Sequence, residues 1–412
     1  MTSTEAVKIG VAGLGGYAQT IAQLLLDHGP ATQPRAEFAA VCEPDLQTHA
    51  EPAERLRERG VTIYDNYEQM LEHPGLEAVW LPVPIDLHVP FAERALAKGL
   101  DVMLEKPVAG TIDEIDQLIA ARDAAGKQVL VGFQDVYDNA TLPLKRRLLS
   151  GELGKVLSAT VHGCWPRDTH YFNRATWAGA LRRGDTWVLD SPANNAMAHF
   201  INIVLFLLGN DEASSARPTH LAAELYRAAD IENFDTASMR VTLNRPDPAN
   251  FLIHLTHACK TNHQPLIRIK TERGEVGWTV HDTSVTLDGQ TLTTPRDSLM
   301  RRNMLEAFAQ SVRGESSNDR CVATLESARC HTTIINAASQ AAAITPVPAS
   351  SIAAVQTEAG TVHAIPEIES VFERCAAQGQ MLHESGLLPF TVPAAELDLT
   401  HYSRFAGPAT AP

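Results

Sequence analysis

The tripeptide Glu105-Lys106-Pro107 contains the first residues of the chain that could do chemistry, and it follows a short apolar run, Val102-Met103-Leu104. Because proline disfavours the helical conformation of the residue before it, we expect Lys106 to end a β-strand. Ligands of open α/β sheets bind in the crevice at the carboxyl ends of the strands. A cation there could polarise the oxygen of a bound substrate; the alternative is a surface lysine in a loop.

A second set of polar residues interrupts an apolar segment that runs from Ser191 to Gly209. Serine can cap a helix and glycine can end one, so the segment predicts a single helix. Asn195, His199 and Asn202 are spaced by four and three residues and would share one face of it. Histidine, whose ordinary pKa is about 6.5, suits proton transfer. The alternatives are hydrogen bonds satisfied within the core and a face at the junction between domains.

The loop from Trp165 to Arg174 mixes aromatic, cationic and hydrogen-bonding side chains. Such mixtures suit the faces and hydroxyls of sugars, and an arginine fork suits a carboxylate, phosphate or sulfonate. The alternative is a loop that packs between domains. The candidate substrate-binding residues are Trp165, Arg167, Asp168, Tyr171, Asp190, Asn194, Asn195 and His199.

A glycine pattern, Gly13-x-Gly15-x-x-Ala18, lies between the first predicted strand and the first predicted helix. Glycines at these positions permit a tight turn and the close approach of a pyrophosphate to the helix N-terminus. Glu43 ends the next strand, where a carboxylate can bind the adenosine ribose and repel a 2′-phosphate. The pattern therefore predicts NAD rather than NADP, with a solvated strand end as the alternative for Glu43. The candidate cofactor-binding residues are Gly13, Gly15, Gly16, Tyr17, Ala18, Glu43, Pro84, His88, Glu105, Lys106 and Gln134.

The elements that must position these residues differ between the two halves of the chain. Short apolar strands alternate with helical patterns up to about residue 150, which predicts a parallel sheet with helical crossovers. Later segments are rich in Thr, Val and Ile with turn signals between them, which predicts an antiparallel sheet. We expect a Rossmann domain at 1–137, an α+β domain for substrate and oligomer contacts at 138–390, and a tail at 391–412, disordered from Pro408.

Composition excludes several classes of protein. The 412 residues include 34 Lys and Arg against 49 Asp and Glu, for a formal charge of −15, which argues against binding to nucleic acids or anionic membranes. The six cysteines are scattered without a Cys-x-x-Cys pair, and His254 and His257 would point to opposite faces of a strand, so we expect no metal site. Because no secretory signal pattern is present, we expect a cytoplasmic protein.

These motifs together resemble those of the Gfo/Idh/MocA family, which includes glucose-fructose oxidoreductases and inositol dehydrogenases. The resemblance rests on the following segments: Gly13-x-Gly15-x-x-Ala18, Glu43, Pro84-x-x-x-His88, Gly99, Glu105-Lys106-Pro107, Gly132-Phe133-Gln134 and Gly151-Glu152-Leu153-Gly154-Lys155-Val156. It implies a Rossmann domain, a C-terminal α+β domain with a large open, mostly antiparallel sheet, a nicotinamide cofactor and a sugar or polyol substrate. It also implies a homo-oligomer, a dimer or a tetramer.

The resemblance assigns catalytic roles to Lys106, beside the reacting oxygen, and to His199, as the acid/base. The aspartate that the family places four residues before this histidine is Asn195 here. Asparagine can orient a hydroxyl but carries no charge and accepts no proton in that role. Asp168, Asp185 and Asp190 are the candidates for a replacement carboxylate.

The sequence therefore predicts an NAD-dependent oxidoreductase that acts on a CH–OH group of a sugar, glycoside or polyol. One alternative is an oxidoreductive glycosidase that recycles its NAD and cleaves a glycoside, an anionic one included, by transient oxidation, elimination and re-reduction. The other is a non-catalytic sensor that binds NAD.

Overall fold

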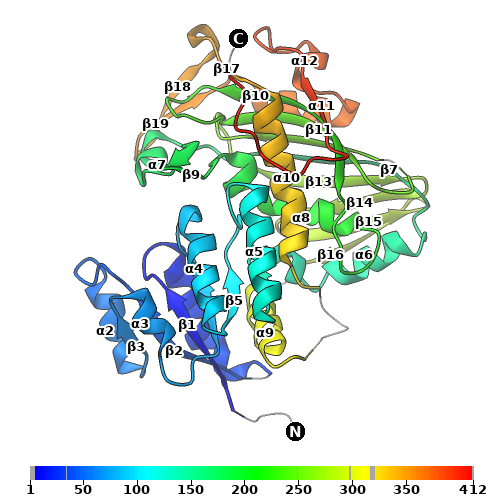
Figure 1. The fold of residues 1–412 in the computed structure, drawn as a ribbon. Coiled ribbons are helices and arrows are strands. Elements are labelled where there is room, and N and C mark those ends of the chain that lie inside the picture. The colour runs from blue at the N-terminus through cyan, green and yellow to red at the C-terminus, as the bar shows by residue number, and fades with distance from the viewer. Residues whose placement is uncertain (1–4, 34, 248, 297, 316–320, 411–412) are drawn as a thin grey trace. The chain divides into compact units, whose positions relative to one another are not determined.

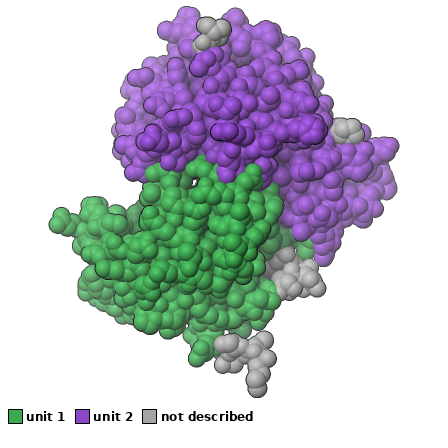
Figure 2. Space-filling model, viewed as in Figure 1, with its two compact units in different colours: residues 1–109, 114–142, 297–328 green, residues 110–113, 143–296, 329–412 purple. Residues whose placement is uncertain are grey.

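The computed structural model describes residues 5–33, 35–247, 249–296, 298–315 and 321–410. The chain forms two compact units, which are coloured separately in Figure 2. Unit 1 comprises residues 1–109, 114–142 and 297–328, and unit 2 comprises residues 110–113, 143–296 and 329–412. The domain limits expected from the sequence stay a prediction.

The described part of unit 1 contains a six-stranded, fully parallel sheet in the order β3-β2-β1-β4-β5-β6. Its strands are β1 (Val7–Ala12), β2 (Ala36–Cys42), β3 (Thr62–Tyr64), β4 (Ala78–Leu81), β5 (Asp101–Leu104) and β6 (Val129–Val131). Strands β4 and β5 are buried at every position, which explains why they read as short apolar runs. The order reverses between β1 and β4, and this switch point is where such sheets bind dinucleotides.

The connections in this region are mostly helical (blue to cyan in Figure 1). They are α1 (Tyr17–His28), η1 (Gly29–Ala31), α2 (Ala50–Glu58), α3 (Tyr67–Leu71), α4 (Ile85–Ala97), α5 (Ile112–Ala125) and η2 (Gln134–Tyr137). Helix α2 begins at Ala50, six residues after Pro44. The Asp45 side chain accepts a hydrogen bond from the Thr48 N–H at 3.1 Å, so a turn occupies that space.

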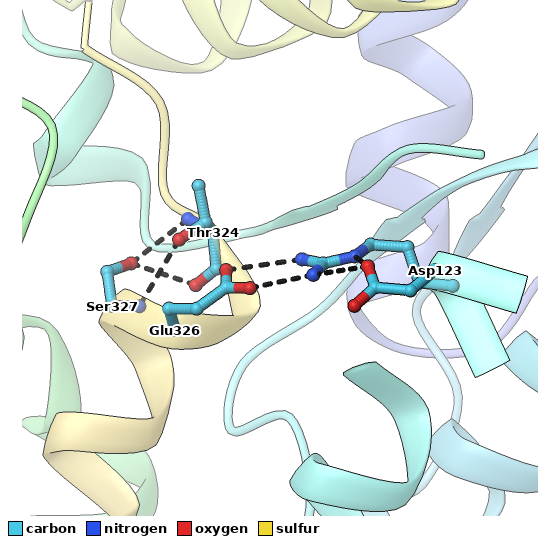
Figure 3. A network of polar contacts seen from close by, with 5 residues as sticks. Asp123, Thr324, Glu326 and Ser327 are labelled. Atoms are coloured by element: carbon cyan, nitrogen blue, oxygen red, sulfur yellow. Dashed lines mark hydrogen bonds and ion pairs between the residues drawn. The ribbon is translucent and has the colours of Figure 1, made fainter. Parts of the chain in front are cut away.

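Residues 297–328 belong to unit 1, although residues 143–296 of unit 2 precede them in the chain. They include α9 (Met300–Val312). Polar contacts fasten this segment at its end (Figure 3). The Arg122 guanidinium donates to Glu326 at 2.7 Å and to Asp123 at 2.8 Å, while the Ser327 hydroxyl accepts from the Thr324 N–H at 3.0 Å. A segment remote in sequence is therefore a fixed part of the Rossmann unit.

Unit 2 is organised around a ten-stranded sheet of described residues in the order β16-β15-β14-β13-β7-β12-β11-β10-β17, with β20 paired to β10. The pairs β7–β12 and β10–β17 are parallel and the other pairs are antiparallel. The strands are β7 (Val156–Cys164), β10 (Pro218–Arg227), β11 (Thr236–Leu243), β12 (Asn250–Thr256), β13 (His263–Thr271), β14 (Gly274–Trp278), β15 (Asp282–Leu287), β16 (Gln290–Pro295), β17 (Ile344–Pro346) and β20 (Ala395–Asp398). The predicted fold class, Rossmann plus a large mostly antiparallel sheet, is confirmed.

The remaining helices and strands lie in unit 2 or extend across a boundary between the residue ranges of the two units. They are α6 (Thr141–Leu149), α7 (Thr169–Asn173), β8 (Arg182–Arg183), β9 (Thr186–Trp187), η3 (Pro192–Ala196), α8 (Ala198–Leu207), α10 (Leu325–Ala341), η4 (Ala349–Ser351), β18 (Ala353–Gln356), β19 (Thr361–Ala364), α11 (Ile368–Gln378) and α12 (Leu382–Ser385).

The end of the chain packs on the sheet of unit 2. Ile368, Phe372 and Leu382 of α11 and α12 share a buried cluster with Cys164 of β7 and Tyr226 of β10. In the tail, β20 pairs with β10, and the N–H of Ala409 donates to the carbonyl of Ser339 at 2.8 Å. The expectation that the chain is disordered from Pro408 is therefore wrong at Ala409, while residues 411–412 lie outside the described residues.

Candidate active site

The glycine loop of unit 1 has the geometry that a dinucleotide needs. Gly13 adopts a φ of 98° and Gly16 a φ of 54°, conformations in which a residue with a Cβ would be strained. Gly16 occupies the N-cap of α1 and, among the described residues, no side chain caps this helix end. Ala18 is fully buried against the sheet. The uncapped N–H groups of α1 therefore fit a pyrophosphate.

Glu43 follows β2 directly and is held in place by the backbone on two sides. Its Oε2 accepts a hydrogen bond from the Leu14 N–H at 2.7 Å, and its Oε1 accepts one from the Asp45 N–H at 2.9 Å. Its side chain is buried. The carboxylate is thus tied to the glycine loop itself, and the spare lone pairs of its oxygens suit the hydroxyls of a ribose.

His49 is a neighbour of this site that the sequence did not reveal. Its Nδ1 lies 3.5 Å from Oε2 of Glu43 and 3.3 Å from the carbonyl oxygen of Asp45. On its other side, a Cβ added to Gly15 would lie 3.2 Å from Nε2 of His49. Because no motif connects position 49 to the glycine loop, only the folded chain shows that the imidazole covers Gly15.

The Glu105-Lys106-Pro107 segment begins where β5 ends, as predicted, and the Lys106–Pro107 peptide is cis. Glu105 is buried and its Oε1 accepts a hydrogen bond from the Trp80 indole N–H at 3.0 Å. Its Oε2 would lie only 2.6 Å from a Cβ at Gly132, so the glycine after β6 makes room for the carboxyl group. Burial raises the pKa of Glu105 to about 7. Lys106 itself is half-buried.

His88 supports the backbone beside Lys106. It is buried, and its Nδ1 and Nε2 lie 2.8 Å from the carbonyl oxygens of Pro107 and Val83, respectively. Burial lowers the pKa of the imidazole. Pro84 precedes α4 as its N-cap residue, and Gln134 opens η2 after β6. His88 thus contacts two backbone carbonyls and can hold that backbone in position. Contact with a cofactor stays a prediction for Pro84, His88 and Gln134.

The predicted helix from Ser191 to Gly209 is interrupted. Its first turn, η3, is π-helical, and the N–H of Met197 donates to the carbonyl of Pro192 at 2.9 Å, five residues back. Met197 then leaves helical geometry at a φ of −112°, and α8 starts at the next residue. π-turns of this kind are frequent at functional sites.

The interruption corrects the predicted polar face. Asn195 lies in the π-turn, whereas His199 and Asn202 lie in α8. The extra residue in the turn shifts the rotation about the axis, so the predicted continuous stripe of three polar residues is wrong. Asn195 and His199 are half-buried and Asn202 is fully buried.

Asp190 is the carboxylate that the structure places beside Asn195. Its Oδ1 accepts a hydrogen bond from Nδ2 of Asn195 at 2.8 Å, and its Oδ2 accepts one from the Gly179 N–H at 2.7 Å. The other candidates serve elsewhere: Asp168 caps α7 by accepting from the Tyr171 N–H at 2.9 Å, and Asp185 is exposed. The resemblance to the family implies an aspartate four residues before His199. This chain has Asn195 there instead, hydrogen-bonded to the carboxylate of Asp190.

The backbone before this pair is strained. Leu189 has a φ of 45°, in the left-handed region that a branched side chain rarely adopts. The buried Asn194 holds it there, because its Nδ2 donates to the carbonyl oxygens of Val188 at 3.1 Å and Leu189 at 3.2 Å. Strained backbone of this kind clusters at functional sites. The side-chain amide nitrogen of Asn194 therefore braces the loop; substrate contact by this residue stays a prediction.

Two arginines flank one tyrosine in the loop after β7. The guanidinium carbons of Arg167 and Arg174 lie 4.5 and 3.7 Å from the ring centroid of Tyr171. His257 lies beneath, with its Nδ1 2.8 Å from the carbonyl oxygen of Trp165, and burial lowers its pKa to about 3. Because the imidazole of His257 is neutral, it adds no charge to the two guanidiniums of Arg167 and Arg174. These guanidiniums are positively charged and suit an anionic ligand group.

The acid–amide pair leads to a stability prediction. In Asn195→Asp, two carboxylates would lie at hydrogen-bond distance and share a proton, which raises one pKa. The folded state would then hold a proton that the unfolded chain releases above about pH 4, so stability falls as pH rises. We expect a loss of about 1–3 kcal/mol at pH 8 and a smaller loss at pH 5, measured by urea unfolding.

The matched control is the swap Asp190→Asn with Asn195→Asp, which restores one acid and one amide. It should recover most of the stability and a pH dependence close to that of the natural protein. If the loss of unfolding free energy in Asn195→Asp, relative to the natural protein, is the same at both pH values, the two side chains are not coupled.

Residues 7–133 match the GFO_IDH_MocA family model, described as an oxidoreductase family with an NAD-binding Rossmann fold. An uncharacterized oxidoreductase, ORF334, of Rhizobium meliloti is 32% identical over 128 residues, 30% of this chain and 36% of its own length. Inositol 2-dehydrogenase of Ralstonia nicotianae is 28% identical over 211 residues, which cover 51% of this chain and 56% of that protein. The matches thus span between about a third and just over half of these curated relatives.

A solved structure extends the likeness to the fold of most of the chain. The WlbA dehydrogenase of Bordetella pertussis, in complex with NADH and UDP-GlcNAcA, superimposes with a TM-score of 0.64 and 20% identity. The match covers 81% of this chain and 95% of WlbA, and at that identity it shows a shared fold. The sequence match to the Gfo/Idh/MocA oxidoreductase family model is thus confined to the Rossmann segment, residues 7–133.

Proposed function

We propose that the protein is an NAD-dependent oxidoreductase that acts on a CH–OH group of a sugar, glycoside or polyol. One observation carries this proposal: the glycine loop after β1 and Lys106 after β5 stand at the carboxyl ends of one parallel sheet, on either side of β4. This is the edge at which open α/β sheets bind their ligands.

In this proposal, each residue of the site has a separate role in the reaction. NAD, when bound, supplies the acceptor for the hydride that leaves the substrate carbon. Lys106 hydrogen-bonds the oxygen on that carbon, and His199 takes the hydroxyl proton. Asn195, aligned by Asp190 at 2.8 Å, orients the substrate. The buried Glu105 and His88 fix the backbone on both sides of Lys106.

Two observations support a carbohydrate substrate. Inositol 2-dehydrogenase, by its name, acts on a polyol, and the WlbA structure contains a sugar nucleotide with an acidic sugar. In unit 2, the half-buried rings of Trp165 and Tyr171 lie next to Arg167 and Arg174. Aromatic faces pack on sugar rings and guanidinium groups bind carboxylates, so uronic or otherwise anionic sugars belong in the first substrate panel.

The test is a panel of neutral and acidic sugars, glycosides and polyols, incubated with NAD and followed at 340 nm together with product analysis. Net NADH formation supports the dehydrogenase. Glycoside cleavage without net absorbance change would instead establish the oxidoreductive glycosidase, and NAD binding without turnover of any member would favour the sensor.

Glu43 carries the preference for NAD over NADP in this proposal. In Glu43→Gln, the negative charge that opposes a 2′-phosphate is lost, while the amide oxygen can still accept a backbone N–H. We expect the ratio of the NADP to the NAD dissociation constant to fall by about 10-fold or more, measured by fluorescence titration. Glu37→Gln on the exposed face of β2 is the control, and an unchanged ratio in Glu43→Gln would remove Glu43 from cofactor selection.

The cellular setting is also proposed. In the described ranges, no helix has both the length and the apolar character needed to cross a bilayer. All six cysteines are buried and none forms a disulfide, which supports a reducing cytoplasm. We propose a homo-oligomer, a dimer or tetramer, and light scattering of the purified protein tests it.

A further inference from the structure

Arg301 of α9 reaches the start of α1, although 284 residues separate it from its partner there. Its Nε–H donates a hydrogen bond of 3.1 Å to the Tyr17 hydroxyl. The guanidinium carbon lies 5.9 Å from the centroid of the same ring. Both residues belong to unit 1, so the contact is internal to the Rossmann unit.

Tyr17 is the first residue of α1, immediately after the N-cap glycine. The helix N-terminus beside it carries N–H groups that no described side chain caps. Arg301 thus brings a cation to the end of the helix that faces the phosphates in a dinucleotide-binding fold. Although 38% of Tyr17 is exposed, desolvation of its hydroxyl, together with the nearby Glu105, raises its pKa to about 12, so the hydroxyl keeps its proton near neutral pH.

Charge explains why a cation is needed here. The glycine loop from Gly13 to Gly16 contains no basic residue, and Glu43 places a buried carboxylate against its backbone. Glu105 is a second buried carboxyl group that interacts with both Tyr17 and Arg301. The chain as a whole carries a formal charge of −15. A pyrophosphate, with about two negative charges, would therefore meet an unfavourable field without a compensating cation.

The position of Arg301 is well defined by its surroundings. Asn303, one turn into α9, donates through Nδ2 to the carbonyl oxygen of Tyr137 at 3.1 Å. In the described part of the chain, the side-chain hydrogen bond that Arg301 makes uses Nε alone, which leaves the Nη donors for a ligand.

We propose that Arg301 binds the pyrophosphate of the dinucleotide and that Tyr17 aligns its guanidinium for this contact. The inference rests on the proposed function, because it adds a residue to the cofactor site of the oxidoreductase. It makes α9, a segment from the C-terminal half of the chain, part of that site.

Titration calorimetry on the full-length protein with three ligands tests the assignment: NAD, ADP-ribose, which keeps the pyrophosphate, and adenosine, which has none. Arg301→Gln should weaken NAD and ADP-ribose to the same degree, by about 10- to 100-fold, and leave adenosine unchanged. Tyr17→Phe should weaken the same two ligands by a smaller factor, since it removes only the alignment. The slope of log Kd for NAD against log salt concentration should also become shallower in Arg301→Gln.

Arg302→Gln on the same helix is the matched control and should bind all three ligands as the natural protein does. The inference is overturned if Arg301→Gln binds NAD and ADP-ribose normally, or if it loses adenosine equally, which would indicate a distorted fold. If the natural protein binds neither NAD nor ADP-ribose, the proposed function itself fails, so the two failures are distinguishable.

Discussion

Lys106→Ala is expected to lower kcat by about 10³-fold with the fold intact. The dissociation constant of NAD should change by no more than about threefold, because the lysine acts on the reacting oxygen rather than on the cofactor phosphates. Steady-state kinetics at 340 nm with the substrate found in the panel, together with NAD titration, measure the two quantities.

The size of this effect follows from the surroundings of Lys106. Glu105 is locked by the Trp80 indole on one side, and the Pro107 carbonyl lies 2.8 Å from His88 on the other. A cation held by such a rigid backbone is preorganised for the oxygen that gains charge in the transition state. Because the half-buried side chain of Lys106 is not part of the packed core, its removal should cost little stability.

Lys98→Ala provides the matched control, since this lysine is exposed after α4 and pairs with Glu72 at the surface. It should retain normal turnover. Lys106→Arg, which keeps the charge but changes its geometry, should recover only part of the activity. Turnover close to that of the natural protein in Lys106→Ala would remove this residue from the reaction.

The features that the sequence predicted well are those encoded by neighbouring residues. Gly13 and Glu43 are predicted from a tight turn and from a strand end; the structure gives Gly13 a positive φ and places Glu43 directly after β2, while their contact with a cofactor stays a prediction. Lys106 belongs to this class, since the proline after it marks the end of the strand.

The features that the sequence missed depend on contacts between remote segments. The π-turn at Asn195 looks like an ordinary helix start in sequence, because serine, proline and small residues suit both. Only the folded loop shows Asp190 beside Asn195, and only the return of α9 shows Arg301 beside Tyr17. No periodicity or spacing in the sequence predicts such pairs, because each residue is compatible with its own helix or loop whether or not the distant partner is present.

His199→Ala is the second substitution with a large expected effect. A general base contributes about 10²- to 10⁴-fold, so kcat/KM for oxidation should fall within that range. Oxidation requires the base in its unprotonated form, so the rate of the natural protein should rise with pH as the base loses its proton. In His199→Ala this acidic limb should disappear, because the group that titrates is gone.

A readout beyond rate separates proton transfer from a structural role. Exogenous imidazole should restore part of the turnover of His199→Ala, since a small base can enter the space left by the side chain, whereas a packing defect would not respond. The exposed His281→Ala in unit 2 is the matched control and should keep both rate and pH profile. A His199→Ala profile that retains its acidic limb would assign the proton to another group; Asp190, which is buried and bonded to Asn195, would be substituted next.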